Sequence, residues 1–417
     1  MIQYRKLDSG ITLVMEKITY LQSVAMGIWV KAGSVDETEK YSGISHFVEH
    51  MSFKGTEKRS AKAIAEDVDR IGGQINAFTG REATCYYVKS TSGTFRKAAD
   101  VLVDMMENSL FSTEEMNKER KVICEEIKMT LDSPEDLAHD TITANVFKGS
   151  DLGKSIIGTP ETLNNIDHDA MKDYVRRQYT RDSIVVSVCG NFDEDEIVKY
   201  FDKKLLCLAE SKKSRKISQN PYNHVYECIK KDIEQTHVCL ATKCIPITDP
   251  DYYAFKILNN VMGGSMSSRF FQNIREEKGL AYSVYSMLGP FTYDGYFNIY
   301  AGVSHEKAEE AIRAIKDELD ILKKDGITSE ELESSREQMK ASFIFSLENV
   351  SGRMFRNGKN LLLTDRIIEE NEVIDGLDSV TMGDIDRIKG SLCNFENYSA
   401  VVVTNNDKDV EKIMQEA

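Results

Sequence analysis

The chain has 417 residues, 41% of them hydrophobic and 29% charged, with a formal net charge of −15 at pH 7. Because domains cluster at roughly 100–200 residues, this length predicts two or more domains, and no apolar run approaches the roughly 20 residues that span a bilayer. The acidic balance disfavours nucleic acid, whose phosphates need a cationic partner, so we expect a soluble globular protein without membrane or nucleic-acid partners.

The N-terminal stretch MIQYRKLDSGITLV has no basic segment leading into an apolar run and a cleavage site, which favours a cytoplasmic location. The eight cysteines are scattered, and none forms a C-x-x-C pair. We therefore expect reduced, mostly buried thiols rather than a cysteine-based metal or redox site.

The first predicted helix lies within residues 41–55, after the polar loop AGSVDETEKYSG, and contains the motif HFVEH. At about 100° per residue, His46, Glu49 and His50 share one face, while the two residues between them point toward a core. Both imidazoles can reach one cation, and Glu49 can take a proton from a metal-bound water. H-x-x-E-H is the inverted zincin motif, which favours a zinc site over two unrelated surface histidines.

Two amphipathic helices are predicted next, over TFRKAADVLVDMMENSL and from FSTEEMNKERKVICEE onward, and similar segments recur as EKAEEAIRAIKDELDIL and ITSEELESSREQMKAS. The second helix of each pair begins with a capping box, Ser112 to Glu115 and Thr328 to Glu331, 216 positions apart. Each half also ends in a strand and an acidic helix start, SIVVSVCGNFDEDEIVKYF and YSAVVVTNNDKDVEKIM. The chain is therefore an internal repeat of two α+β halves.

Between the halves, CLAESKKSRKISQNPYN is polar, basic and contains a proline, which is typical of a surface linker. We expect an N-terminal domain over residues 1–208, a linker over 209–223 and a C-terminal domain over 224–417. The basic run in this segment is interpreted as solvated linker rather than as a binding patch, and consists of Lys212, Lys213, Arg215 and Lys216.

A catalytic zinc usually has three protein ligands, so a third ligand is expected outside the HFVEH motif. The helix after Ser112 offers Glu114, Glu115, Glu119, Glu125 and Glu126. Glu119 and Glu126 are seven residues apart and share a face, whereas Glu125 points elsewhere and Glu115 has the capping role. The second half, which lacks H-x-x-E-H, has Ser335 and Ser342 at the corresponding positions. We interpret Glu126 as the third ligand and Glu119 as a supporting carboxylate that orients a ligand or water.

These motifs resemble those of the insulinase/pitrilysin family of zinc metallopeptidases, in the short branch that contains the mitochondrial processing peptidase and bacterial processing-peptidase-like proteins. The similarity extends over essentially the whole chain. The family motif is H-x-x-E-H followed about 76 residues later by the last glutamate of E-R-x-x-x-x-x-E, matched here by His46, Glu49, His50, Glu119, Arg120 and Glu126. The resemblance implies one zinc per chain, bound by His46, His50 and Glu126.

Two further stretches resemble functional segments of this family. GGQINAFTGREATCYYV resembles the segment that aligns a peptide substrate as an added strand, which assigns substrate binding to Gln74, Asn76, Ala77 and Phe78. IREEKGLAYSVYS resembles an arginine and tyrosine pair that holds a substrate carbonyl and stabilises the oxyanion, here Arg275 and Tyr282. Taken alone, the two stretches indicate only a glycine turn before a strand and a charged helix end before a hairpin.

The resemblance also implies two homologous α/β-roll domains, each an antiparallel sheet of about six strands with helices packed on one face. It implies a homodimer enclosing an acidic chamber, in which Arg275 and Tyr282 of one chain can serve the zinc of the other. The predicted function is a zinc-dependent endopeptidase that cleaves unfolded or short peptides with Glu49 as general base. The alternative is a noncatalytic peptide-binding or assembly subunit.

Overall fold

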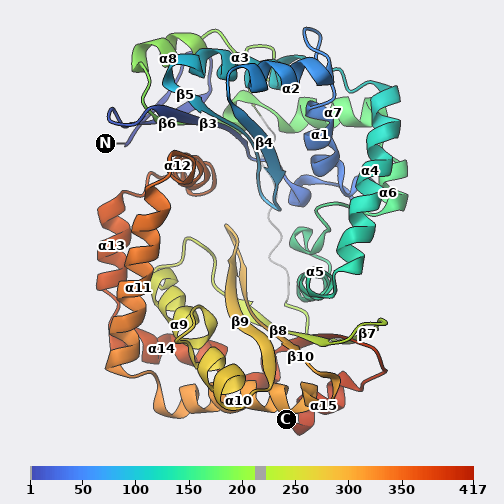
Figure 1. The fold of residues 1–417 in the computed structure, drawn as a ribbon, viewed down its shortest axis with the longest axis vertical. Coiled ribbons are helices and arrows are strands. Elements are labelled where there is room, and N and C mark those ends of the chain that lie inside the picture. Colours follow the sequence, from blue (N-terminus) through green and yellow to red (C-terminus); the bar gives the residue numbers. More distant parts are fainter. Residues whose placement is uncertain (1, 212–221) are drawn as a thin grey trace. The chain divides into compact units, whose positions relative to one another are not determined.

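The computed structural model describes residues 2–211 and 222–417, which divide into two compact units (Figure 1). Unit 1 comprises Met1–Lys128, Lys154–Lys216 and Ile344–Glu369, and unit 2 comprises Met129–Gly153, Ile217–Phe343 and Glu370–Ala417. Each unit therefore takes in one segment from the other half of the sequence. The predicted basic run of the linker lies outside the described residues.

Unit 1 contains a six-stranded sheet and most of the helices of the first half. Its strands are β1 (Ile2–Lys6), β2 (Thr12–Lys17), β3 (Ser23–Val30), β4 (Gln74–Thr79), β5 (Thr84–Thr91) and β6 (Ile184–Gly190). Its helices are α1 (Ile44–Ser52), α2 (Ala61–Arg70), α3 (Phe95–Asn108), most of α4 (Thr113–Asp132), α6 (Pro160–Asn164), α7 (His168–Gln178), α8 (Glu194–Phe201) and α12 (Val350–Thr364).

Unit 2 contains a five-stranded sheet and the remaining helices. Its strands are β7 (Tyr226–Lys230), β8 (Thr236–Cys244), β9 (Ala281–Pro290), β10 (Gly295–Val303) and β11 (Ser399–Thr404). Its helices are α5 (Pro134–Val146), α9 (Tyr252–Gly263), the π-helix Phe270–Glu277, α10 (Ala308–Asp325), most of α11 (Ser329–Leu347), α13 (Glu370–Asp378), α14 (Met382–Leu392) and α15 (Val410–Glu416).

The two sheets have the same strand order. The order is β1-β2-β6-β3-β5-β4 in unit 1 and β7-β11-β8-β10-β9 in unit 2, so the sheets correspond strand for strand once the extra edge strand β1 is set aside. Each sheet contains one parallel pair, β2 with β6 and β7 with β11, and all its other pairs are antiparallel. The prediction of two homologous α/β domains is confirmed, and the parallel pair is an addition to the antiparallel sheet expected from the sequence.

Both faces of the unit 1 sheet are covered. Val24, Met26 and Ile28 of β3 belong to the main core with α1 and α3, while Ala25 and Trp29 on the opposite face pack with residues of α12. Figure 1 shows α3 and α8 on one side of this sheet and α12 on the other. The predicted helix layer on one face is thus joined by a second layer from a distant part of the sequence. Because β3 is buried on both sides, its sequence is a continuous apolar run.

The sheet of unit 2 is covered in the same manner. Ala138, Ile142 and Val146 of α5 pack with Ala241 and Val401 of the sheet in one apolar cluster. Figure 1 shows α5 on one side of this sheet and α10 on the other. Each sheet therefore has one face covered by a helix from the opposite half of the chain.

All eight cysteines lie in the described residues and are free, and five of them are buried, as expected for mostly buried thiols. None of the helices within the described ranges is long and apolar enough to cross a membrane.

Candidate metal centre and active site

Helix α1 begins at Ile44, three residues later than the earliest predicted start, because Gly43 adopts a left-handed conformation with φ of 90° that interrupts the helix. Gly43 has no side chain to cap the first turn, and the buried carboxylate of Glu37 takes that role. It accepts hydrogen bonds from the backbone N–H groups of Gly43 at 2.7 Å and Ser45 at 2.8 Å. The helix that contains HFVEH is therefore held in place at its first turn.

The packing of α1 determines which side chains can bind a ligand. Phe47, Val48 and Met51 are buried in the main core of unit 1, whereas the side chains of His46 and His50 are 14% and 17% exposed. This division confirms the predicted helical arc, in which the two imidazoles share one face and the residues between them face the core.

The imidazoles meet Glu126 of α4. His46 Nε2 and His50 Nε2 are 3.2 Å apart, and Glu126 Oε2 is 3.9 Å from the former and 3.5 Å from the latter. Zinc–nitrogen bonds of about 2.0–2.1 Å in a tetrahedral site separate ligand atoms by roughly 3.3 Å, so these three atoms fit one zinc ion. Among the described residues, this is the only cluster of three or more histidine, cysteine or acidic side chains with such spacing.

The two histidines of the cluster have opposite protonation preferences, and that of His46 suits a metal ligand. Burial, together with the nearby charge of His50, lowers the pKa of His46 to about 4, so its imidazole is neutral at physiological pH and has a free lone pair. Burial also acts to lower the pKa of His50, but the hydrogen bond with Glu119 and the charge of Glu126 outweigh it and raise this pKa.

Glu119 supports the cluster from about two turns earlier in α4 than Glu126. Its Oε1 lies 2.9 Å from His50 Nδ1, and its Oε2 lies 2.7 Å from Lys54 Nζ. Burial opposes ionisation of Glu119, yet the bonds from His50 and Lys54 lower its pKa below the ordinary value. A carboxylate that holds Nδ1–H fixes the ring and leaves Nε2 available for a metal, which is the geometry of the role predicted for Glu119.

Glu49 lies on the same helix but is only 9% exposed. Burial raises its pKa, and the Thr79 hydroxyl, which donates to Glu49 Oε2 at 2.5 Å, partly counteracts that rise. A carboxylate with a raised pKa is a stronger proton acceptor than an ordinary glutamate, which is what a general base needs.

The predicted substrate-binding residues lie on β4, the edge strand of the unit 1 sheet. Gln74, Asn76 and Phe78 alternate as exposed residues, and the backbone N–H of Ala77 donates to the side-chain oxygen of Asn76 at 2.8 Å. Phe78 is 40% exposed and packs edge-on against Trp29, with ring centroids 5.5 Å apart. The free edge can pair with an extended peptide, while Phe78 also has a packing role.

Arg275 and Tyr282 both lie in unit 2, Arg275 on the π-helix and Tyr282 in β9. The Arg275 guanidinium is 5.6 Å from the centroid of the Tyr282 ring and 4.7 Å from that of Phe271. Tyr282 is 75% exposed, so its ring and hydroxyl are accessible to a ligand. The structure therefore brings the predicted pair together within unit 2.

Sequence reasoning did not identify Glu37, Lys54 or Thr79. Thr79 could have been noticed, because the alternation of side chains along β4 places it on the same side of the strand as Ala77. The contacts of Glu37 and Lys54 depend on chain turns at the two ends of α1, and such turns have no periodic pattern in the sequence.

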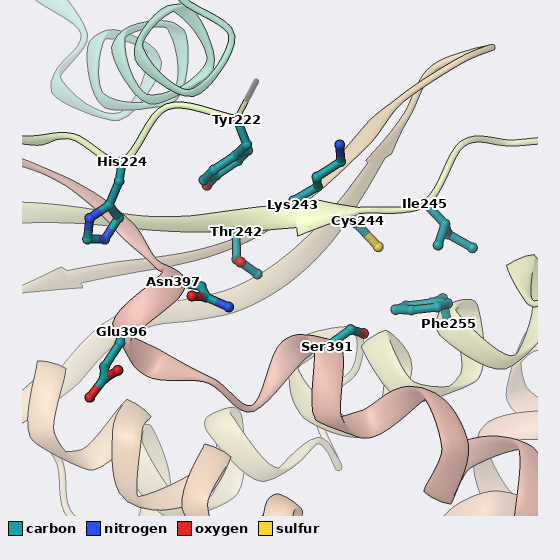
Figure 2. Close-up of a pocket in the computed structure, with 10 residues that line it drawn as sticks. All are labelled: Tyr222, His224, Thr242, Lys243, Cys244, Ile245, Phe255, Ser391, Glu396 and Asn397. Atoms are coloured by element: carbon teal, nitrogen blue, oxygen red, sulfur yellow. The ribbon is translucent and has the colours of Figure 1, made fainter. Parts of the chain in front are cut away.

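A separate pocket of about 690 Å³ lies in unit 2 (Figure 2). Figure 2 shows Thr242 and Cys244 of β8, Phe255 of α9 and Asn397 around it. None of the predicted site residues lines this pocket.

The structure thus has two repeated α/β units and, in the described residues, a single candidate zinc centre formed by His46, His50 and Glu126. Comparisons with known proteins identify the family. Residues 12–160 match the profile of insulinase, peptidase family M16, and residues 165–339 match that of the peptidase M16 inactive domain. The chain belongs to peptidase family M16, as a zinc metallopeptidase of the short, processing-peptidase-like type.

Relatives of similar length support this assignment. The chain is 41% identical over 404 residues to the uncharacterized zinc protease YmxG of Bacillus subtilis, covering 97% of this chain and 98% of that protein. It is 35% identical over 402 residues to an uncharacterized zinc protease of Rickettsia bellii, covering 96% and 97%. The solved structure of a protease from Helicobacter pylori has the same fold, with a TM-score of 0.89 at 22% identity over 97% of this chain and 99% of that chain.

Proposed function

We propose that this protein is a zinc-dependent endopeptidase that cleaves unfolded or short peptides, with one zinc per chain. The observation that carries the proposal is the convergence of His46 Nε2, His50 Nε2 and Glu126 Oε2 within 4.8 Å, next to the buried carboxylate Glu49. Relatives named zinc proteases along almost the whole chain support it further.

Each side chain has a distinct role in this proposal. His46, His50 and Glu126 would hold the zinc, which supplies a Lewis acid that polarises a peptide carbonyl and lowers the pKa of a water. Glu49 accepts the proton of the attacking water and then returns it to the leaving amine. Glu119 keeps the His50 ring in the orientation that directs Nε2 to the cluster, through its 2.9 Å contact with Nδ1.

The substrate would be held as an added strand on β4. Main-chain pairing at a free edge binds an extended peptide with little demand on its side chains, which is why unfolded or short peptides are the proposed substrates. The alternation of exposed residues, Gln74, Asn76 and Phe78, supports this role because they flank the backbone groups that a peptide would pair with.

Arg275 and Tyr282 are proposed to hold the substrate carbonyl and stabilise the oxyanion. Their mutual contact and the exposure of Tyr282 support a role for the pair in ligand binding. We further propose a homodimer enclosing a chamber, in which this pair serves the zinc of the partner chain. A mixed dimer of Glu49→Gln and Tyr282→Phe chains would then recover part of the activity, whereas no recovery would contradict sharing between chains.

The function is tested with Glu49→Gln. This change removes the base and leaves the three proposed ligands, so cleavage of a fluorogenic peptide library is expected to fall by roughly 10²- to 10⁴-fold while zinc content stays the same. A chelator should abolish cleavage by the unaltered enzyme, and added zinc should restore it. A Glu49→Gln variant with full activity would contradict the proposal.

The second candidate is a noncatalytic peptide-binding or assembly subunit. It is favoured by the match of residues 165–339 to a domain described as inactive. In that case no peptide of a diverse library would be cleaved, or cleavage would be insensitive to a chelator, although peptides could still bind. A buried base beside the ligand cluster argues for the endopeptidase.

A further inference from the structure

Thr79 lies where the proposed substrate strand meets the proposed base. It is the last residue of β4, and its hydroxyl donates to Glu49 Oε2 at 2.5 Å, from a strand to a helix 30 positions away in the sequence. Its side chain is on the same side of β4 as Ala77 and opposite the exposed Phe78. One strand therefore presents its free edge to a peptide and a hydroxyl donor to the base.

The backbone around Thr79 is held from several directions. Thr79 pairs with Thr84 of β5, and the turn that follows is closed by a hydrogen bond from Gly80 N–H to Ala83 carbonyl at 2.8 Å. The same turn accepts a hydrogen bond from Val35 N–H at Arg81 carbonyl, 3.0 Å away. Because a β-branched side chain also has few χ1 states, the hydroxyl has a fixed position relative to the sheet.

This contact makes the two oxygens of Glu49 different. Oε2 is bonded to Thr79, whereas Oε1 has no hydrogen-bond partner among the described residues. A carboxylate with one oxygen anchored cannot rotate freely, so the other oxygen is presented in one direction. General-base catalysis depends on such alignment, since a displacement of about 1 Å can cost roughly a hundredfold in rate.

We propose that Thr79 is a positioning residue that anchors Oε2 of Glu49 and thereby presents Oε1 for proton transfer. This inference rests on the proposed endopeptidase function and adds to it a link between substrate strand and base. Because β4 carries both the peptide edge and the anchor, the register of the bound peptide and the position of the base are set by the same segment of backbone.

The test compares Thr79→Val with Thr79→Ser. Valine keeps the shape and removes the donor, so kcat is expected to fall roughly ten- to a hundredfold while KM and zinc content stay within about twofold. Serine restores the hydroxyl and is expected to recover most of kcat. Thr91→Val is the matched control, because it removes an exposed hydroxyl in the same sheet that bonds only to Thr94 in the described structure, and it should behave as the unaltered enzyme.

Two results would overturn the role of Thr79 while leaving the endopeptidase intact. These are unchanged kcat in Thr79→Val, and an equal loss in Thr79→Ser and Thr79→Val. Absence of chelator-sensitive cleavage by the unaltered enzyme would instead contradict the proposed function. A crystal structure of Thr79→Val decides the anchoring independently of activity: a displaced Glu49 carboxylate supports it, and an unmoved carboxylate overturns it.

Discussion

Units 1 and 2 share a strand order, yet within the described residues only unit 1 contains a cluster that could hold a metal ion. On the corresponding helices α4 and α11, Glu119 is 5% exposed and Ser335 is 6% exposed, so the two positions are equally buried. The same fold position thus holds a carboxylate in one unit and a hydroxyl in the other. The comparison shows that the fold supplies the positions, while a few side chains decide whether a metal site exists.

Replacing Glu126, the proposed third ligand, by the serine that unit 2 has at the corresponding position is expected to have the strongest effect. Glu126→Ser removes one of three ligands and matches Ser342, so bound zinc is expected to be lost and cleavage to fall by roughly a thousandfold or more. Metal analysis and the peptide assay measure the two effects. Glu125→Ser is the control, because Glu125 is exposed and pairs only with Lys128 in the described structure. Full zinc occupancy in Glu126→Ser would refute this ligand set.

Glu119→Ser copies Ser335 and is expected to have a smaller effect. The three proposed ligands stay in place, but the His50 ring loses the carboxylate that orients it, and such supporting groups typically contribute roughly 10- to 100-fold in metal affinity. Competition with a chromophoric chelator measures the zinc dissociation constant. An affinity equal to that of the unaltered protein would show that Glu119 does not orient the His50 ring for metal binding.

Each unit has a buried carboxylate with a shifted pKa, Asp104 on α3 in unit 1 and Glu318 on α10 in unit 2. Burial acts to raise the pKa of Asp104, but hydrogen bonds from Thr56, Asn108 and Arg59 outweigh it and lower this pKa. Burial raises the pKa of Glu318, and its bond from Asn273 does not reverse the rise. The two groups therefore contribute to stability with opposite pH dependence.

A depressed pKa means that the contribution of Asp104 is present above its unfolded pKa of roughly 3.9 and is lost as pH falls through the folded value. Asp104→Asn should cost about 1–3 kcal/mol near neutral pH and progressively less in acid. Glu318 contributes below roughly pH 4.3, and this contribution is lost as pH rises through its folded pKa, so Glu318→Gln should gain stability relative to the unaltered protein as pH rises. Urea unfolding of both variants at pH 3–8 measures the slopes, and slopes of equal sign would contradict the assignment.

A weaker effect is expected at the two predicted capping boxes, because among the described residues both reciprocal bonds form only in unit 2. In unit 2, Thr328 N–H donates to Glu331 at 2.7 Å and Glu331 N–H donates to Thr328 Oγ1 at 3.1 Å. In unit 1, the bond from Glu115 N–H to Ser112 Oγ is a longer 3.4 Å. Thr328→Ala should therefore cost about 1 kcal/mol and Ser112→Ala less, as measured by thermal unfolding. An equal cost would show that bond length at the cap does not distinguish the two helices.

Local periodicity predicted much of the fold and of the metal cluster. The spacing of His46 and His50 depends only on helical geometry. The second half of the chain has Ser342 where the first half has Glu126, and this difference helped to choose Glu126 among the acidic residues of α4. The internal repeat likewise predicted two similar α/β halves. Helical spacing involves a single helix, and the repeat involves only the similarity of two segments. Neither depends on knowing which distant residues are in contact.

Contacts between distant segments could not be predicted in this way. The bond from Thr79 to Glu49 depends on how β4 packs against α1, and the cap from Glu37 depends on a loop that folds back on the helix. The later start of α1 follows from the backbone of Gly43, which a sequence pattern does not reveal. The covering of each sheet by α12 or α5 links positions about a hundred residues or more apart in sequence.

Helix α5 of the first half belongs to unit 2 and helix α12 of the second half belongs to unit 1, which is the pattern of a domain swap within one chain. When two copies of a one-unit protein exchange an identical element, each copy completes its neighbour, and this is the definition of a domain swap. Joining two such copies end to end would give the arrangement of α5 and α12 seen here. A half-length chain ending before residue 212 would leave the apolar face over Ala25 and Trp29 uncovered, and we expect it to fold stably only as a swapped dimer, in which two copies of α5 take the place of α12.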